Sequence, residues 1–368
     1  MTISANSFAR RLEKLRSELA SLKVDALVIE RPLDLAYLTG LKLSAGKLLV
    51  HSKETLLAVD GRYRDHAQKQ APVPVIDATK KALLGAFDRP SWKKVRTVGF
   101  DAHAFSYKDY LTWKALLAAT KKARRITTAF KLKPLDHPIL NLRLIKDEAE
   151  LRLIEKSAAL LWKGFQKIKA SLREGMSEQE LAVAFEMYCK KEGASSLSFD
   201  PIIAFGSNSA FPHYVTGKRR LKRGDLVLID IGVIVDGYAS DMTRVLFFGP
   251  SSPRLKKIFS VVKKAQEAAL ALCKPGVRGS ALDAAARAVM AAEGWEEHYL
   301  HTLGHGIGLE VHEPPRLSIH HPDVILKPGM VVSIEPGLYF PNLGGARYED
   351  MVIITSSGHR NLFPQSGV

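Results

Sequence analysis

The chain has little cysteine, no long apolar run and no excess of acidic residues. Its 368 residues include 2 cysteines, Cys189 and Cys273, which fall on separate predicted helices, so we expect no disulfide framework and a reducing compartment. No run is long and apolar enough to predict a membrane span, and residues 1–11 lack the apolar core of a secretory signal. We therefore expect a cytoplasmic protein with no membrane partner.

The charge balance is basic, with 54 Lys and Arg residues against 38 Asp and Glu and a formal net charge of +16. Such a charge attracts phosphate backbones nonspecifically. However, the basic residues are scattered in short clusters, such as residues 121–125 and 218–220, without interleaved aromatic residues or a recognisable nucleic-acid-binding module. We therefore expect no nucleic-acid partner and assign the charge to solvated surface.

The length and the apolar pattern predict an α/β protein of two domains. Single hydrophobic cores rarely grow much beyond roughly 250 residues, so one core is unlikely to serve the whole chain. Leucines at steps of three and four predict a helix over residues 7–22. Short β-rich runs predict strands over residues 24–29, 47–51 and 55–59. The N-terminal part is therefore expected to be a small α/β domain.

The domain boundary is expected near residues 131–145, where two prolines in residues 131–138 interrupt any regular pattern. We place the end of the first domain so that it covers residues 1–133. The second domain then opens with a long amphipathic helix whose apolar positions run through residues 151–172. The next helix begins with a capping box formed by Ser177 and Glu180.

A repeat dominates the second domain. Residues 221–232 recur 105 positions later as residues 326–337, and each copy runs an apolar strand into a carboxylate. That carboxylate is Asp230 in the first copy and Glu335 in the second. A second acid follows each copy, so four carboxylates from two related halves are expected to converge.

The second acids and the preceding helices extend the same duplication. Asp241 follows the first copy and Glu349 follows the second. Upstream, glycine and leucine positions of residues 175–193 are matched 101 positions on in residues 276–294. Each half is thus predicted to hold helices, a strand ending in an acid, and another acid-bearing strand, arranged around a pseudo-two-fold axis.

The first half contains a predicted β-hairpin that places its two acids on one face. An Asp-Gly pair at residues 236–237 between apolar runs is a strong hairpin signal. With a two-residue loop, Asp230 faces Thr243 and Gly232 faces Asp241, whereas a three-residue loop would shift this register. The two aspartates are then diagonal neighbours. We expect the Thr243 hydroxyl to support Asp230 by a hydrogen bond.

Two like charges on an apolar strand pair repel one another and resist burial, so something must neutralise them. The alternative is that both acids face solvent on the wet side of the sheet. The second half disfavours that alternative, because it repeats the pattern with a strand that carries Arg347, Glu349 and Met351 on one face. A divalent cation is the expected neutralising group.

Three histidines lie between the acids of the first half and those of the second, in a segment with closely spaced glycines. His301, His305 and His312 recur at steps of four and seven, beside Gly304, Gly306 and Gly308. A lone histidine is more often structural, but three beside duplicated acids favour ligand and catalytic roles. Four carboxylates with one imidazole suit Mn²⁺, Co²⁺, Fe²⁺ or Zn²⁺ and disfavour copper or an iron–sulfur cluster. Two such cations would support hydrolysis.

These residues resemble the metallopeptidase family with the pita-bread fold, which includes methionine aminopeptidase, aminopeptidase P and prolidase. The first 130 residues resemble the creatinase-type N-terminal domain of aminopeptidase P and prolidase, so the resemblance covers the whole chain in outline. It implies an α/β fold class, with a smaller creatinase-type α/β domain over residues 1–133 and a duplicated pita-bread α/β domain over residues 134–368. The positions that coincide with the family's five metal ligands are Asp230, Asp241, His305, Glu335 and Glu349.

The resemblance also implies a role for each ligand. Asp230 and Glu349 would each favour one side of a metal pair, and Asp241 would bridge the pair together with Glu349. His305 would bind a single metal ion. Glu335 would bind metal and orient or deprotonate the attacking water.

Further catalytic residues are implied by position. His312 matches the residue that stabilises the tetrahedral intermediate, and His213 matches one near the scissile amide. His301 and Arg347 match positions that line the site in proline-specific members, although His301 could be an exposed loop residue and Arg347 a simple ion-pair partner. Residues 302–304, Thr-Leu-Gly, depart from the Arg-Thr-Gly usual in proline-specific relatives, which affects the expected fine specificity.

The resulting hypothesis is a dinuclear-metal peptidase that cleaves the N-terminal Xaa-Pro bond, as an Xaa-Pro aminopeptidase or an Xaa-Pro dipeptidase. It would use two divalent metal ions, manganese foremost with cobalt, zinc or iron as alternatives, on peptides with proline in the second position. The resemblance further implies a homodimer. Two alternatives stay open: a methionine aminopeptidase, which shares the five ligands, and a noncatalytic pita-bread protein that binds peptide or nucleic acid.

Overall fold

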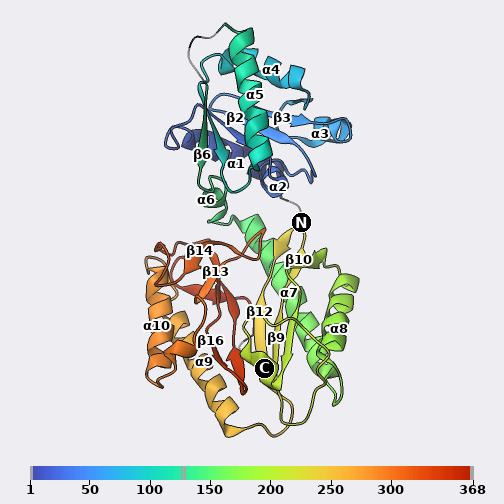
Figure 1. The fold of residues 1–368 in the computed structure, drawn as a ribbon, viewed down its shortest axis with the longest axis vertical. Helices are drawn as coiled ribbons and strands as arrows, with labels where there is room; N and C mark the ends of the chain where they lie inside the picture. The colour runs from blue at the N-terminus through green and yellow to red at the C-terminus, as the bar shows by residue number, and fades with distance from the viewer. Residues whose placement is uncertain (1–2, 126, 128–129, 365–368) are drawn as a thin grey trace. The chain divides into compact units, whose positions relative to one another are not determined.

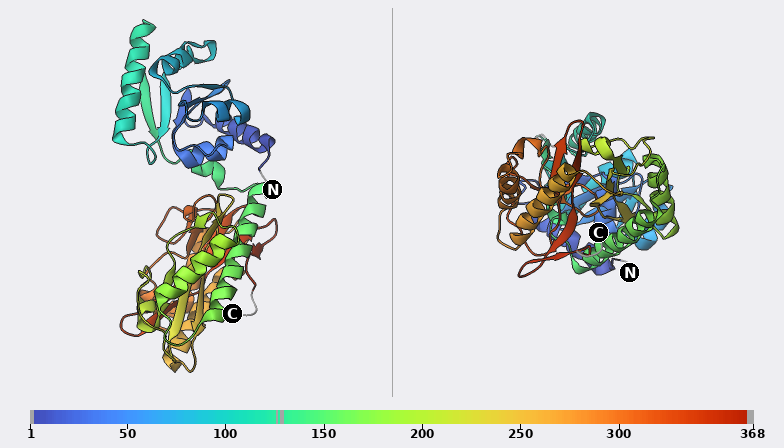
Figure 2. Two further views of the ribbon diagram at one scale, coloured as in Figure 1. Left: turned by 90° about the vertical axis from the view of Figure 1, so that its right-hand side faces the viewer. Right: turned by 90° about the horizontal axis from the view of Figure 1, so that it is seen from below.

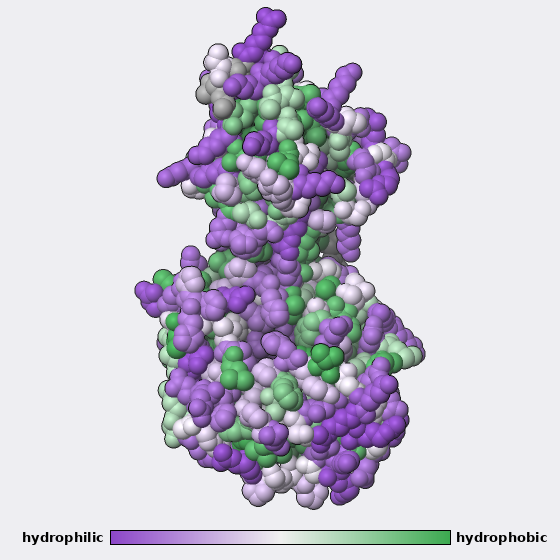
Figure 3. All heavy atoms as spheres, in the orientation of Figure 1, coloured by the Kyte–Doolittle hydropathy of each residue, from purple (hydrophilic) through white to green (hydrophobic). Residues whose placement is uncertain are grey.

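The computed structural model describes residues 3–125, 127 and 130–364 and divides the chain into two compact units. Unit 1 is Met1–Leu142 and unit 2 is Arg143–Val368. Within the described residues, no helix is long and apolar enough to cross a membrane. On the face drawn in Figure 3, hydrophobic residues lie in small groups among hydrophilic ones. Scattered apolar residues of this kind are normal on a protein surface.

Unit 1 is an α/β domain built on one six-stranded sheet, in the order β4-β3-β2-β1-β5-β6. Strands β1, β5 and β6 run parallel, and β2 is antiparallel to both β1 and β3. Helices cover both faces of the sheet, with α5 on one side and α1 on the other (Figures 1 and 2). Its elements are α1 Ala5–Glu18, β1 Ala26–Ile29, α2 Pro32–Thr39, β2 Lys47–His51, β3 Thr55–Val59, α3 Arg64–Gln70, β4 Val75–Asp77, α4 Lys80–Asp88, η1 Pro90–Trp92, β5 Thr97–Asp101, α5 Tyr107–Ala123, β6 Lys131–Leu135 and α6 Leu140–Arg143.

The sequence predictions for unit 1 are confirmed for the strands and corrected at two points. The first helix ends at Glu18, and the buried Leu19 therefore lies just after the helix and not within it. The segment expected to interrupt the pattern forms the strand β6. Pro134 lies within that strand, and an edge strand tolerates proline because one of its sides needs no ladder hydrogen bond.

Unit 2 pairs two related halves, each with two helices and a set of antiparallel strands. Figure 1 shows α7 and α8 on one flank of the strands and α9 and α10 on the other. The first half holds α7 Glu148–Ser171, α8 Glu178–Lys191, β7 Ser196–Leu197, β8 Ile202–Phe205, η2 Gly206–Ala210, β9 Leu226–Ile231, β10 Val233–Val235, β11 Tyr238–Ala239 and β12 Met242–Phe247. The second holds α9 Pro253–Ala271, α10 Gly279–Ala291, η3 Glu296–His298, β13 Gly304–Gly306, β14 Glu313–Leu317, β15 Val331–Ile334, β16 Gly337–Phe340, β17 Gly344–Arg347, β18 Asp350–Ile354 and β19 His359–Asn361.

The two helices predicted at the start of unit 2 are present. In α7 the apolar positions face the core, with Ile154, Leu161 and Phe165 fully buried. Helix α8 begins with the expected capping box, in which Ser177 accepts from the Glu180 amide and the Glu180 carboxylate accepts from the Ser177 amide. These caps satisfy amides that the helix itself leaves unpaired.

The duplication is visible in equivalent backbone hydrogen bonds of the two halves. The Gly175 amide donates to the Leu221 carbonyl at 2.9 Å, and the Gly276 amide donates to the Leu326 carbonyl at 2.9 Å. Both glycines have positive φ, at 79° and 84°, which residues with a side chain rarely adopt. The repeated sequence therefore encodes the same loop-to-strand geometry twice.

The hairpin of the first half has the register predicted for a two-residue loop. Val235 pairs with Tyr238 across the turn, and Asp230 pairs with Thr243 in the β9–β12 ladder. A Cβ at Gly232 would lie 2.4 Å from the Ser240 carbonyl oxygen, so only glycine fits opposite this strand. The register brings Asp230 and Asp241 to the same end of the strand pair.

The two cysteines are unpaired and buried in unit 2, and burial raises the pKa of both the Cys189 and the Cys273 thiol to about 12. Because only the thiolate reacts at a useful rate, we expect neither thiol to react with Ellman's reagent in the folded protein at pH 8. Two thiols per chain should react after unfolding in guanidinium chloride. Rapid labelling of either thiol before unfolding would contradict this burial.

Candidate metal centre

The acids and histidines singled out in the sequence come from both halves of unit 2 and meet at the ends of their strands. Asp230 is near the end of β9, and Asp241 directly precedes β12. In the second half, His305 lies on β13, Glu335 directly follows β15, and Glu349 directly precedes β18. Because β12 and β18 contact one another, the two halves share one site.

The side chains form three overlapping groups, and within each group the ligand atoms lie within 4.8 Å of one another. The first group is Asp230, Asp241 and Glu349, and the second is His305, Glu335 and Glu349. His312 joins Asp241 and His305 in a third. The structure therefore gathers all five predicted ligand positions, together with His312, in one cluster.

The acids of this cluster are buried, which contradicts the alternative of a solvent-facing strand pair. Asp230 is 7% exposed, Asp241 is 5% exposed and Glu349 is 1% exposed. Burial raises the pKa of all three carboxyls, most strongly for Asp241 and Glu349, where neighbouring carboxylates add to the effect. Arg347 opposes the shift at each of them, and His305 does so at Asp241.

Unpartnered oxygens show that the cluster fits cations. Among the described residues, one oxygen of each of Asp230, Asp241 and Glu349 is buried without a hydrogen-bond donor. A buried anionic oxygen without a partner is costly, and a bound cation removes that cost. The donor set of carboxylates and imidazole suits divalent transition metals, so the residues present fit a metal centre.

His305 and Glu335 form a close pair whose charges stabilise each other. His305 Nε2 lies 3.1 Å from Glu335 Oε1. Burial alone would raise the pKa of Glu335, but the hydrogen bond and charge of His305 outweigh burial and lower it to about 2. The same contact raises the pKa of His305 although burial opposes it. Glu335 is therefore an ionised carboxylate at neutral pH.

Neighbouring polar groups orient these two side chains. His305 Nδ1 donates to the Gly306 carbonyl at 3.1 Å, which leaves Nε2 pointing into the cluster. The Ser333 hydroxyl donates to Glu335 Oε1 at 3.1 Å and accepts from the His305 amide at 3.0 Å. Ser333 thus ties β15 to β13 beneath the site.

Thr243 links the two halves. Its hydroxyl donates to Glu349 Oε2 at 2.9 Å and accepts from Arg347 Nε at 3.1 Å. The sequence prediction that this hydroxyl donates to Asp230 is wrong, because its one proton is donated to Glu349 and Asp230 Oδ2 accepts from Arg347 instead. Thr243 therefore supports the acid of the second half.

Arg347 connects the cluster to His301. Its Nη2 donates to Asp230 Oδ2, and its Nη1 donates to the Tyr339 hydroxyl at 2.6 Å. The Tyr339 hydroxyl lies 2.9 Å from His301 Nε2. Since His301 Nδ1 lies 2.8 Å from the Thr302 carbonyl, which can only accept, Tyr339 donates to Nε2. Burial lowers the pKa of His301 to about 4, so the ring is neutral at neutral pH.

His312 and His213 lie at the more open side of the cluster. The His312 ring contacts the His305 ring edge-on, with centroids 4.2 Å apart, and burial lowers the pKa of His312 to about 4. His213 is exposed in the loop that follows η2 and influences the pKa of both His301 and His312. Two exposed apolar residues, Phe211 at 62% and Val215 at 85%, flank it.

The glycines of residues 304–308 let other groups approach where a side chain would collide. A Cβ at Gly304 would lie 2.0 Å from the Ser333 carbonyl oxygen, and one at Gly306 would lie 2.1 Å from the Pro314 carbonyl oxygen. A Cβ at Gly308 would lie 2.4 Å from the Glu313 carboxylate. These glycines therefore permit the tight packing that holds His305 in place.

Two residues of the site were missed in the sequence. Ser333 lies two positions before Glu335 on a strand, and the period of two places both on one face, so the alternation could have found it. Tyr339 contacts His301 and Arg347 through the fold of β16 and β17, and no local sequence signal marks it.

Comparison with known proteins agrees with this geometry. The model of metallopeptidase family M24 matches residues 152–356, and the model of the creatinase/prolidase N-terminal domain matches residues 11–145. The chain is 34% identical over 355 residues to the Xaa-Pro dipeptidase of Pyrococcus furiosus, a match that covers 96% of this chain and 97% of the relative.

Solved structures give the same picture. A structure of the Xaa-Pro dipeptidase from Bacillus anthracis matches with a TM-score of 0.89 and 32% identity, over 98% of this chain and 99% of that one. The X-Pro aminopeptidase from Thermotoga maritima matches with a TM-score of 0.83 and 30% identity, over 94% of this chain and 97% of that one. The chain belongs to metallopeptidase family M24 and carries a creatinase/prolidase N-terminal domain before its pita-bread domain.

Proposed function

We propose that this peptidase hydrolyses the bond between a first residue and a proline in the second position, acting on Xaa-Pro dipeptides. The observation that carries the proposal is the buried cluster of Asp230, Asp241, Glu349, Glu335 and His305, whose unpartnered carboxylate oxygens fit cations. Similarity to Xaa-Pro dipeptidases over nearly the whole chain supports the substrate. Similarity to an X-Pro aminopeptidase makes longer Xaa-Pro peptides the second candidate.

Two divalent cations would be held by the five ligand side chains, with manganese as the proposed ion and cobalt, zinc or iron as alternatives. When bound, they would supply Lewis-acid activation of water and of the substrate carbonyl. Carboxylates and a neutral imidazole are suitable donors for each of these ions. The proposed ligands are Asp230, Asp241, His305, Glu335 and Glu349.

The chain's own acid–base groups are suited to the reaction. Glu335 is ionised at neutral pH and oriented by Ser333, so it would accept the proton of the attacking water. His312 is neutral, since burial lowers its pKa to about 4. A neutral imidazole still has one N–H, which would donate to the oxygen on which negative charge develops. His213 would lie near the scissile amide.

His301 and Arg347 would form the wall that receives the proline side of the substrate. Arg347 is held between Asp230 and Tyr339, and Tyr339 in turn fixes the His301 ring. A wall whose side chains are held by hydrogen bonds loses little entropy when substrate binds.

We also propose a homodimer and a cytoplasmic location. The unpaired cysteines support a reducing compartment.

Replacing one acid of the cluster tests the metal assignment. In Asp241→Asn we expect Xaa-Pro hydrolysis to fall at least about 100-fold, with less metal per chain, because a neutral amide is a poorer ligand than a carboxylate. The metal-free variant should melt no lower than the metal-free parent, since one of the repelling charges is gone. Full activity with unchanged metal content would refute the assignment.

A substrate panel tests the specificity. With Mn²⁺ supplied, we expect hydrolysis of Xaa-Pro dipeptides to exceed that of Xaa-Pro tripeptides, and Met-Ala peptides to be left intact. Amino-acid release is measured by liquid chromatography. Preference for tripeptides would favour the aminopeptidase candidate, Met-Ala cleavage would favour a methionine aminopeptidase, and no cleavage of any peptide would favour a noncatalytic binding protein.

The close packing at Gly306 provides a test of how precisely His305 must be positioned. In Gly306→Ala the new methyl group would collide with the Pro314 carbonyl, so β13 and His305 must shift. Because a shift of about 1 Å can cost about 100-fold in rate, kcat/KM should fall by roughly that factor. Gly61→Ala is the matched control, since its Cβ would meet nothing within 4 Å. Equal kcat/KM for the two variants would show that the close packing at Gly306 is not required.

A further inference from the structure

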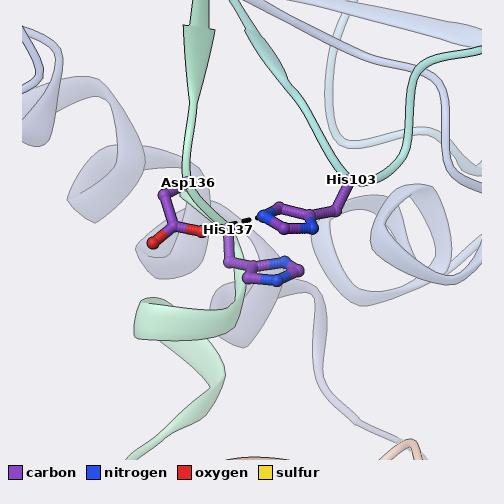
Figure 4. Close-up of side chains that lie close together, drawn as sticks. All are labelled: His103, Asp136 and His137. Carbon is purple, nitrogen blue, oxygen red and sulfur yellow. Dashed lines mark hydrogen bonds and ion pairs between the residues drawn. The ribbon is translucent and has the colours of Figure 1, made fainter. Parts of the chain in front are cut away.

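A second group of metal-ligand residues lies in unit 1, at one edge of its sheet. His103, Asp136 and His137 each offer a ligand atom, and these atoms lie within 4.8 Å of one another (Figure 4). All three belong to the N-terminal unit, and none is part of the peptidase cluster. The catalytic proposal gives them no role.

The strand register explains why these residues meet. Strands β5 and β6 are parallel neighbours, and Asp101 pairs with Leu135 at their carboxyl ends. His103 lies in the turn that follows β5, while Asp136 and His137 lie in the turn that follows β6. The group therefore lies beyond the carboxyl ends of two adjacent parallel strands, at the edge of the sheet.

Contacts within the group already resemble those of a ligand set. His103 Nε2 lies 2.9 Å from Asp136 Oδ1, and the two imidazole rings are stacked with centroids 3.7 Å apart. A shared cation would use both imidazoles as neutral donors. The His103 and Asp136 side chains are 55% and 87% exposed, so small rotations can bring the three donors around one ion.

Two further features indicate that the fold holds these side chains in a defined arrangement. His137 has a φ of +43°, a conformation that residues with a side chain rarely adopt, and its ring is stacked on the His103 ring. Behind the rings, Asp101 is buried, accepts from the His103 amide at 2.9 Å, and has Oδ2 4.0 Å from His137 Nδ1. The hydrogen bond from the His103 amide to Asp101 holds the turn that carries His103, whereas Asp101 and His137 are too far apart for a hydrogen bond.

We propose that His103, Asp136 and His137 form a separate mononuclear site for a late divalent transition metal, with Zn²⁺ as the expected ion. Two imidazoles and one carboxylate are a common zinc ligand set, and water would complete the coordination. The inference is independent of the peptidase reaction, because it rests on residues of unit 1 alone.

The test is the zinc content of the full-length protein. The parent, His103→Ala, His137→Asn and Asp136→Asn are stripped with chelator, incubated with excess Zn²⁺ and desalted, and bound zinc is measured by inorganic mass spectrometry. Asparagine at position 137 tolerates positive φ, and Asp136 is so exposed that its replacement leaves the fold intact. His66→Ala, which removes an exposed histidine of the same unit, is the control.

We expect each of the two histidine variants to bind one zinc ion per chain fewer than the parent, whatever number the peptidase cluster holds. Asp136→Asn should bind the ion at least tenfold more weakly in a zinc titration, and His66→Ala should match the parent. Equal zinc content in all variants would overturn the site. Xaa-Pro hydrolysis of the same samples reports separately on the proposed function, so failure of one proposal is distinguishable from failure of the other.

Discussion

The repulsion among the buried carboxylates of Asp230, Asp241 and Glu349 is the constraint on which the larger unit depends. Burial and mutual proximity raise the pKa of each carboxyl, and one oxygen of each lacks a donor. Such a cluster would be among the least stable parts of an ordinary core. Arg347 and Thr243 tie the acids of one half to those of the other, so the proposed cations would complete the site without a rearrangement of these side chains.

Duplication accounts for the scaffold but not for the chemistry. The two halves repeat the same loop-to-strand hydrogen bonds, and each delivers one acid at the end of β9 or β15 and one directly before β12 or β18. The histidines of residues 301–312 have no counterpart in the first half. They make the site asymmetric: His305 pairs with Glu335, the neutral His301 accepts from Tyr339, and the neutral His312 lies at the more open side. A symmetric scaffold thus holds an asymmetric set of acids, bases and hydrogen-bond donors.

Much of the fold and of the candidate site could be predicted, because both leave local patterns. The Asp-Gly turn determined the β9–β12 register, and Ser177 with Glu180 determined the start of α8, since these signals act over a few residues. The strand at Pro134 was missed because its tolerance of proline depends on its place at the sheet edge, which no local pattern reveals. Tyr339 was missed for the same reason: its partners His301 and Arg347 are brought to it by strand pairing.

The sequence by itself determined which residue types carry chemistry, how they are spaced and that they occur in two related halves. Only the tertiary structure decided that the acids are buried, that Thr243 donates to Glu349 of the other half, and that His103 meets Asp136 and His137 at the ends of two adjacent parallel strands. The physical reason is that spacing along the chain is encoded locally, whereas burial, pKa and contact between distant residues depend on how strands pair and pack.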